Sequence, residues 1–250
     1  MDVYAYLLTI VSGLIIGSFL NSVIYRLDDL KTIIHERSHC PKCNKKLGLF
    51  DLIPLFSFII LHGQCRYCKE KISWQYPLVE LFTALIFTLL FFTYGNVIYT
   101  YLLVVLSCFL IIIFVYDGIN QLIPDEGFWP ALILAIVSIF FANSTNYTNN
   151  VYGALIGIGI ILLIYFITKG RGIGLGDVKL VAIFGLVLGW SLTILNIFLA
   201  FVLGAIYGLF LLYNKKKGWK DAVAFGPFLI IGFYISLFWG EIILRWYLGM

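Results

Sequence analysis

The chain has 250 residues, of which 62% are hydrophobic and only 12% are charged, with a mean hydropathy of +0.99. A soluble domain carries about twice that share of charged residues. The composition therefore excludes an ordinary soluble globular protein and indicates a polytopic membrane protein embedded in a lipid bilayer. The net charge of +4 is small, and no basic face interleaved with aromatic residues points to a nucleic-acid partner.

The apolar stretches predict an all-α polytopic membrane protein with about eight transmembrane helices. The predicted spans cover residues 3–25, 77–93, 98–116, 128–142, 151–168, 178–190, 192–213 and 225–247. Two of them, 128–142 and 178–190, are short for a hydrocarbon layer of about 30 Å. The first span lacks the basic leading residues and the small-residue cleavage site of a secretory signal, so we expect it to remain as a helix.

The basic residues predict how the chain is oriented in the membrane. All but one of the 17 Lys and Arg residues fall in or beside the loops after the first, fifth and seventh spans; Arg245 is the exception. Positively charged loops face the cytoplasm, so we expect both termini outside. The loop after the first span is the one predicted extramembrane segment large enough to fold. We therefore predict a first helix at 1–25, a cytoplasmic domain at 26–76 and a membrane core at 77–250.

Four of the five cysteines form two C-x-x-C pairs in this loop, Cys40 with Cys43 and Cys65 with Cys68. Two thiolates on each of two tight turns can close a tetrahedral site, and the spacing is typical of a structural zinc site. The alternatives are two disulfides, which are disfavoured on the cytoplasmic face, or four unrelated thiols. His39 is the best substitute ligand among the nearby histidines, and a solvated loop histidine is its simpler interpretation.

The chain has only thirteen acids, so elimination is practical. The acids of loops and tails are expected to be solvated charges: Asp2, Asp28, Asp29, Glu36, Asp51, Glu70 and Asp221. Glu241 lies four residues before Arg245, and a helical ion pair accounts for it. The five remaining acids are Glu80, Asp117, Asp125, Glu126 and Asp177.

Asp117 and Asp177 are each predicted at the cytoplasmic end of a span, at similar depth. Two carboxyl groups sharing one site cannot both ionise easily, so one can activate a water while the other polarises a peptide carbonyl. The alternative is that Asp177 pairs with Lys179 or Lys169 and that Asp117 is a boundary charge. Whether the two acids meet stays open at this point.

Two further features surround this predicted pair. Gly174 and Gly176 remove side chains just before Asp177, so another segment can come close. Asp125 precedes a span, where it can either take part in the site or complement the dipole of its own helix.

Six motifs spread along the chain are similar to those of the type IV prepilin peptidases, which are bifunctional leader peptidases and N-methyltransferases of the bacterial inner membrane. They are Gly17-Ser-Phe-Leu-Asn21 through Arg26; the two cysteine pairs, from Arg37 to Cys43 and from Gly63 to Cys68; the segments Asp51–Pro54 and Tyr76–Glu80, which flank the second pair; Asp117 to Asp125; Gly174-Leu-Gly-Asp177-Val-Lys179; and Phe225–Phe228. One position departs from the pattern: many members have a second Asp two residues after the first, and this chain has Ile119.

The resemblance implies a function for each position. Asp117 and Asp177 would be the catalytic pair of an aspartic endopeptidase, with Gly174, Gly176, Lys179 and Asp125 in supporting positions. The substrate would be a prepilin or pseudopilin, cut at the cytoplasmic membrane face between a basic leader and an apolar helix. The new N-terminal residue would then be methylated with S-adenosylmethionine. Glu80, at the start of the second span, is a candidate to orient the substrate amine or the methyl donor; an interfacial carboxylate bonded to a neighbouring helix end is the alternative.

Two other functions are compatible with the same features. One is a membrane transporter or adaptor with a zinc-bound loop, in which the paired aspartates form an ion relay. The other is a peptidase without methyltransferase activity. The sequence contains no Gly-rich Rossmann fingerprint that would mark a nucleotide pocket, and it indicates no oligomeric state.

Overall fold

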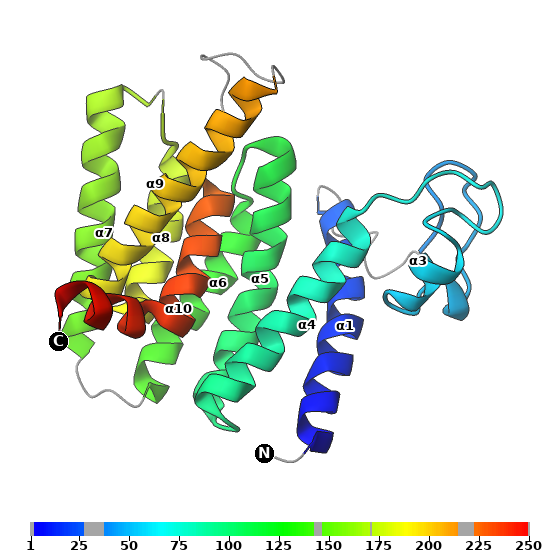
Figure 1. The fold of residues 1–250 in the computed structure, drawn as a ribbon, viewed down its shortest axis with the longest axis horizontal. Coiled ribbons are helices and arrows are strands. Elements are labelled where there is room, and N and C mark those ends of the chain that lie inside the picture. Colours follow the sequence, from blue (N-terminus) through cyan, green and yellow to red (C-terminus); the bar gives the residue numbers. More distant parts are fainter. Residues whose placement is uncertain (1–2, 28–37, 143–146, 171, 215–222, 250) are drawn as a thin grey trace. The chain divides into compact units, whose positions relative to one another are not determined.

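The structure is a computed structural model that describes residues 3–27, 38–142, 147–170, 172–214 and 223–249. In these ranges the regular structure is helical, apart from two isolated bridges in the cysteine loop. The chain forms two compact units, Met1–Thr100 and Tyr101–Met250 (Figure 1).

Several sequence predictions concern residues outside these ranges. They are the solvated charges Asp2, Asp28, Asp29, Glu36 and Asp221, the histidine His35, and the basic loop residues Lys31, Arg37, Arg171, Lys215, Lys216, Lys217 and Lys220.

Every predicted span corresponds to a helix. The helices are α1 (Val3–Tyr25), α4 (Gln75–Tyr94), α5 (Ile98–Asn120), α6 (Asp125–Phe141), α7 (Tyr147–Thr168), α8 (Leu175–Leu188), α9 (Trp190–Tyr213) and α10 (Gly226–Leu248). Two predicted starts, 128 and 178, are three residues late. The reason is that α6 and α8 each open with a polar first turn, which contains Asp125 and Glu126 in α6 and Asp177 in α8.

Six of the described helices are long and apolar enough to cross a membrane. The other two long apolar helices, α6 and α8, have 17 and 14 residues. At 1.5 Å per residue, α8 is only about 21 Å long, which is less than the thickness of the hydrocarbon layer. The predicted all-helical membrane architecture is therefore confirmed. Eight apolar helices are present in the described residues, six of them are long enough to be candidate spans, and α8 is too short to cross as a straight rod.

In the first unit, one stripe of small residues brings α1 against α4. A Cβ atom on Gly13 would lie 2.5 Å from Cα of Ala84, and one on Gly17 would lie 2.7 Å from Cα of Glu80. One turn further on, the Asn21 side-chain amide donates to the backbone oxygen of Tyr76 at 3.1 Å. The two helices thus run antiparallel at backbone contact distance, as small residues allow in membranes. Between them the chain forms the cysteine loop, with the short helices η1 (Leu49–Asp51) and α3 (Phe56–Ile60).

In the second unit, α8 is the central helix. It contacts α6, α7, α9 and α10, and α9 crosses in front of it in Figure 1. Leu180, Val181, Ile183 and Phe184 are 0% exposed, and the Phe184 ring stacks on Phe233 of α10 at 4.6 Å. Because neighbours cover α8 on all these sides, the end of α8 that carries Asp177 is held inside the bundle.

The backbones of α7 and α8 approach each other closely. A Cβ atom on Gly185 would collide with the backbone of Gly153 and Ala154. Glycine at this position therefore sets the distance between the two helices.

Gly185→Ala is expected to lower the thermal unfolding midpoint of the detergent-solubilised protein, because the added methyl group forces α7 and α8 apart. Overpacking of this kind costs about 1–3 kcal/mol. Gly159→Ala is the matched control, since a Cβ atom there meets nothing within 4 Å. Equal midpoints for the two variants would contradict this account of the helix contact.

Candidate functional site

Asp117 lies in the last turn of α5, where the helix ends at the left-handed residue Gln121, φ +55°. Its side chain is almost fully enclosed, at 5% exposure. The Oδ2 atom of Asp117 has no hydrogen-bond partner among the described residues. A buried carboxyl oxygen without a partner is rare in proteins, so this atom is available to a water molecule or a substrate.

Asp177 is in the first turn of α8 and is 6% exposed. Its Oδ2 atom accepts a hydrogen bond of 2.9 Å from the Gly174 amide, and its own amide donates to the Gly174 carbonyl oxygen at 3.2 Å. This capping arrangement places a carboxyl group at a helix N-terminus, where the helix dipole favours negative charge. The position of the Asp177 carboxyl group is thus fixed by the start of its own helix.

The N-terminus of α10 brings the elements that carry these two acids together. A Cβ atom on Gly226 would lie 2.5 Å from Oδ2 of Asp117 and 3.3 Å from Cδ1 of Leu180, which is one turn beyond Asp177. The carboxyl groups of Asp117 and Asp177 are near enough to interact electrostatically. Three helix ends, from α5, α8 and α10, therefore converge on a pair of buried acids.

Lys179 does not serve as the partner of Asp177. Its ammonium group bonds Oδ1 of Asp125 at 2.7 Å and lies 5.2 Å from the centre of the Phe128 ring. Asp125 is the first residue of α6, so the ion pair ties the start of α6 to the start of α8. Asp125 thus lies in the first helical turn, as one interpretation of the sequence expected, and also contacts a residue of the predicted motif.

The two predicted glycines differ in their surroundings. A Cβ atom on Gly176 would lie 2.9 Å from Cδ1 of Ile123, so the connection from α5 to α6 packs directly over this residue. A Cβ atom on Gly174 would meet only Asp177 and Gly176, at 3.7 Å and 3.8 Å. Gly176 is therefore a point of close approach for a side chain of the same unit, while Gly174 is in contact only with its own turn.

In the first unit, the four predicted cysteine ligands form one cluster. The Sγ atoms of Cys40, Cys43, Cys65 and Cys68 all lie within 4.8 Å of one another, and those of Cys40 and Cys68 are 3.8 Å apart. A tetrahedral zinc ion with Zn–S bonds of about 2.3 Å requires sulfur atoms about 3.8 Å apart. The donor set and its spacing therefore fit a four-thiolate metal ion, and no described histidine belongs to the cluster.

The two cysteine turns have the same backbone pattern, displaced by 25 residues. The amides of Asn44 and Lys69 donate to the carbonyl oxygens of Cys40 and Cys65, and both donors are left-handed, at φ +55° and +60°. Isolated bridges close the turns at matching positions, His39 with Lys46 and Gln64 with Lys71. Each turn thus presents two sulfur atoms in the same way, as a symmetrical metal site requires.

The thiol groups affect one another. The amide of Cys43 is the main reason that the pKa of Cys40 falls to about 7. The Glu70 amide lowers the pKa of Cys68, but desolvation and the other three thiols outweigh it and raise that pKa to about 12. Four thiolates at these distances repel one another, and a bound cation relieves the repulsion.

Asp51 corrects one sequence prediction. We expected a solvated loop charge, but its side chain is only 6% exposed and accepts a 2.7 Å bond from Nε of Arg66. Its second oxygen accepts from the Gly48 amide at 3.1 Å. Asp51 therefore ties the η1 segment to the second cysteine turn. By contrast, the predicted pair of Glu241 and Arg245 is present, at 3.5 Å.

Glu80 belongs to the first unit and is 7% exposed. Its Oε2 atom accepts a hydrogen bond of 2.8 Å from the Leu55 amide, and the Ser18 hydroxyl is a second neighbour. Glu80 thus joins the start of α4 to the cysteine loop and to α1. Glu80 therefore lies in the same unit as the four-cysteine cluster, and not in the unit that holds Asp117 and Asp177.

Two site residues were missed by reasoning from sequence. Gly226 was noted only as part of the motif at the start of the last span, and the pairing of that motif with Asp117 is tertiary. Asn21 was noted only within the first-helix motif; an asparagine in an otherwise apolar span was the available signal.

Comparison with known proteins identifies the family. Residues 11–94 match the model of the bacterial peptidase A24 N-terminal domain, and residues 104–209 match that of the type IV leader peptidase family. The chain is similar to proteins named prepilin leader peptidase/N-methyltransferase. One from Pseudomonas putida is 33% identical, covering 95% of this chain and 92% of the relative; one from Bacillus subtilis (strain 168) is 31% identical, covering 95% and 96%. No solved structure matched. The two matched domain models and the similarity to these relatives over nearly the full chain show that the chain belongs to the type IV leader peptidase family.

Proposed function

We propose that the protein cleaves the leader peptide of prepilins or pseudopilins and then N-methylates the new N-terminal residue. The observation that carries the first activity is the convergence of Asp117 and Asp177, two buried acids, in the unit that matches the leader peptidase model. The names of the similar proteins support both activities. Family membership favours hydrolysis over the ion-relay alternative.

The proposed mechanism needs one ionised and one protonated carboxyl group. The ionised carboxylate takes a proton from water, whose oxygen attacks the scissile carbonyl, while the protonated carboxyl gives its proton to the carbonyl oxygen. The tetrahedral species then collapses: the nitrogen leaves with the proton that the first carboxyl group took from water, and the second carboxyl group recovers a proton from a hydroxyl of the tetrahedral species. The unpartnered Oδ2 atom of Asp117 is the available contact for the water, and the Gly174 amide holds Asp177 in place.

We propose that the site faces the cytoplasm. Lys169 directly follows α7 and Lys179 lies near the start of α8, and the positive-inside rule places such basic residues at the cytoplasmic face. A prepilin has a basic leader followed by an apolar helix, so its scissile bond lies naturally at that interface. Both termini of the enzyme are then outside, in a bacterial cytoplasmic membrane.

We assign the metal to the four cysteines as a structural Zn²⁺ ion. Zinc in such a site cross-links the two turns and supplies folding energy rather than chemistry. We assign cleavage to the part of the predicted core at 77–250 that forms the second unit and holds Asp117 and Asp177. We assign methyl transfer to the loop domain at 26–76 together with the helices α1 and α4 of the first unit. S-adenosylmethionine is the proposed methyl donor.

Asp117→Asn and Asp177→Asn are each expected to lower the rate of prepilin cleavage by about 10²- to 10⁴-fold or more, because a neutral amide neither accepts nor supplies the required proton. Cleavage by the purified full chain is measured on a prepilin, and the mass of the product N-terminus reports methylation. Glu241→Gln, an exposed acid, is the control. Full processing by either Asp variant would refute the pair; cleavage by the unaltered protein without added methyl mass would leave a peptidase only.

Gly226→Ala is expected to lower the cleavage rate by about ten- to a hundredfold while the fold persists. The new Cβ atom would displace the Asp117 carboxyl group, which is the movable end of a side chain, rather than a backbone segment. Gly208→Ala is the matched control, because a Cβ atom there meets nothing within 4 Å. Unchanged kinetics for Gly226→Ala, at an unchanged unfolding midpoint, would exclude Gly226 as a determinant of the site.

Elemental analysis of the purified protein is expected to find about one zinc ion per chain. Cys65→Ser is expected to lose most of the zinc, because three thiolates bind more weakly than four. Cys108→Ser is expected to retain it, since Cys108 lies in α5, outside the four-cysteine cluster, where its thiol donates to the Val104 carbonyl oxygen. Equal zinc content in the two variants would rule out the four-cysteine assignment.

A further inference from the structure

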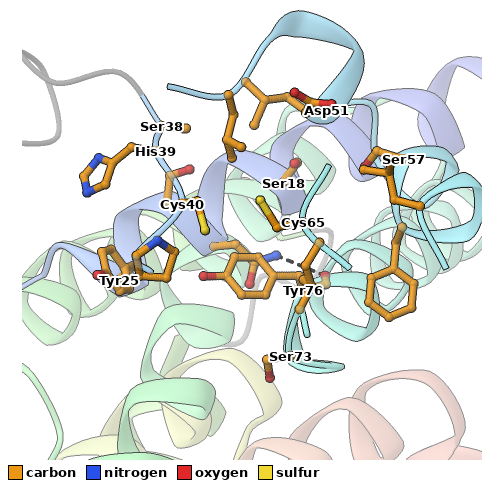
Figure 2. Close-up of a pocket in the computed structure, with 18 of the residues that line it drawn as sticks. Ser18, Tyr25, Ser38, His39, Cys40, Asp51, Ser57, Cys65, Ser73 and Tyr76 are labelled. Carbon is orange, nitrogen blue, oxygen red and sulfur yellow. Dashed lines mark hydrogen bonds between the residues drawn. The ribbon is translucent and has the colours of Figure 1, made fainter. Parts of the chain in front are cut away.

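The first unit contains a cavity of about 350 Å³ whose wall includes Cys40 and Cys65. It is bounded by the last turns of α1, the cysteine turns, the segment around η1 and α3, and the start of α4 (Figure 2). Small-molecule sites occupy about 300–1,000 Å³. The cavity is therefore large enough for a ligand of nucleoside size, and the proposed function gives it no role so far.

The deepest polar group of the cavity wall is Asn21, which is 2% exposed. Its side-chain NH₂ donates to the carbonyl oxygens of Gly17 and Tyr76, at 3.3 and 3.1 Å. These two bonds fix the orientation of the side-chain amide. Its NH₂ group points toward the two carbonyl oxygens, and its acceptor Oδ1 points away from them. That oxygen has no partner among the described residues. A buried acceptor left without a donor indicates a missing binding partner.

Glu80 supplies negative charge beside it. The carboxylate is held by the Leu55 amide and the Ser18 hydroxyl. A carboxylate has about four acceptor positions, so these two contacts leave capacity for a ligand. A buried anionic group and a buried carbonyl oxygen in one cavity wall recognise a cation, since a buried charge needs an opposite charge.

The rest of the wall suits a ligand with an aromatic base and a carboxylate. In Figure 2 the rings of Tyr25 and Tyr76 lie on the lower side of the cavity, with Asp51 on the upper side. The aromatic rings offer faces on which a base can stack. Lys42 and Lys71 line the same cavity and can meet a carboxylate.

We propose that this cavity binds S-adenosylmethionine, with Glu80 and Asn21 recognising its sulfonium charge. The inference rests on the proposed methyl transfer and adds the place where the donor binds. In the reaction the neutral N-terminal nitrogen forms a bond to the methyl carbon, and the carbon–sulfur bond breaks with its electron pair going to sulfur. The products are a neutral thioether and a protonated secondary amine, so charge is conserved.

The test measures binding of S-adenosylmethionine to the full chain in detergent by equilibrium dialysis, with S-adenosylhomocysteine as its uncharged counterpart. The unaltered protein is expected to bind the sulfonium about ten- to a hundredfold more tightly than the thioether. Glu80→Gln keeps the size of the side chain and an acceptor for Leu55, so the fold is retained while the charge is lost. In this variant the preference for the sulfonium is expected to disappear. Glu241→Gln is expected to keep it.

A second variant and a second readout guard against misfolding. Asn21→Ser shortens the side chain and removes the unpaired acceptor, and it is expected to weaken sulfonium binding. A saturating donor is expected to raise the unfolding midpoint of the unaltered protein but to raise it less in both variants, because binding stabilises the folded state by mass action. Zinc content reports whether the cysteine loop is intact.

The possible failures are distinct. If the unaltered protein cleaves but neither binds the donor nor methylates, the proposed methyl transfer fails and this inference fails with it. If the protein methylates and Glu80→Gln binds the sulfonium and the thioether with unaltered affinities, the function stands and the donor site is elsewhere. If Glu80→Gln methylates the peptide N-terminus less efficiently while its affinity for the donor is unchanged, the cavity binds the acceptor peptide instead of the donor. That result would also overturn the proposal.

Discussion

The enclosure of α8 is the constraint on which the second unit depends. A short helix that begins with an acid has to be covered on every side, because neither its carboxyl group nor its first amides can face hydrocarbon. Gly185 lets α7 approach at backbone distance, and Phe184 stacks on α10. The Gly174 amide meets the acid itself. Because neighbouring helices cover α8 on these faces, its N-terminal end is the place where α5 and α10 can bring other polar groups to Asp177.

The sequence predicted the helices well for a physical reason. A membrane helix has to be apolar along its whole crossing, so composition alone locates it. The same argument placed the starts of α6 and α8 too late. Their first turns contain the acids Asp125 and Asp177, and an apolar composition does not identify a polar helical turn. Elimination among thirteen acids left five because ionisable residues in such a chain are few, and predicted positions at the cytoplasmic ends of spans then singled out Asp117 and Asp177. Their proximity could not be predicted, since it depends on where α10 begins.

Side-chain partners were the least predictable feature. Lys179 lies two residues from Asp177, yet it bonds Asp125, 54 residues away. Asp51 looked like an ordinary loop acid, and its bond to Arg66 exists only because the loop folds back over the second cysteine turn. Asn21 is similar: its spacing of four from Gly17 was visible, but its contact with Tyr76 requires the antiparallel packing of α1 and α4. In each case the chain had to be folded before the partner could be identified.

The cysteine turns have a consequence that extends beyond metal binding. Cys40 and Cys65 lie in the wall of the cavity that also contains Glu80 and Asn21. The two turns therefore form part of the cavity wall, and a metal ion held by the four cysteines would cross-link them. Occupancy of the cavity and binding of the metal would then be linked by a coupling free energy that acts equally in both directions.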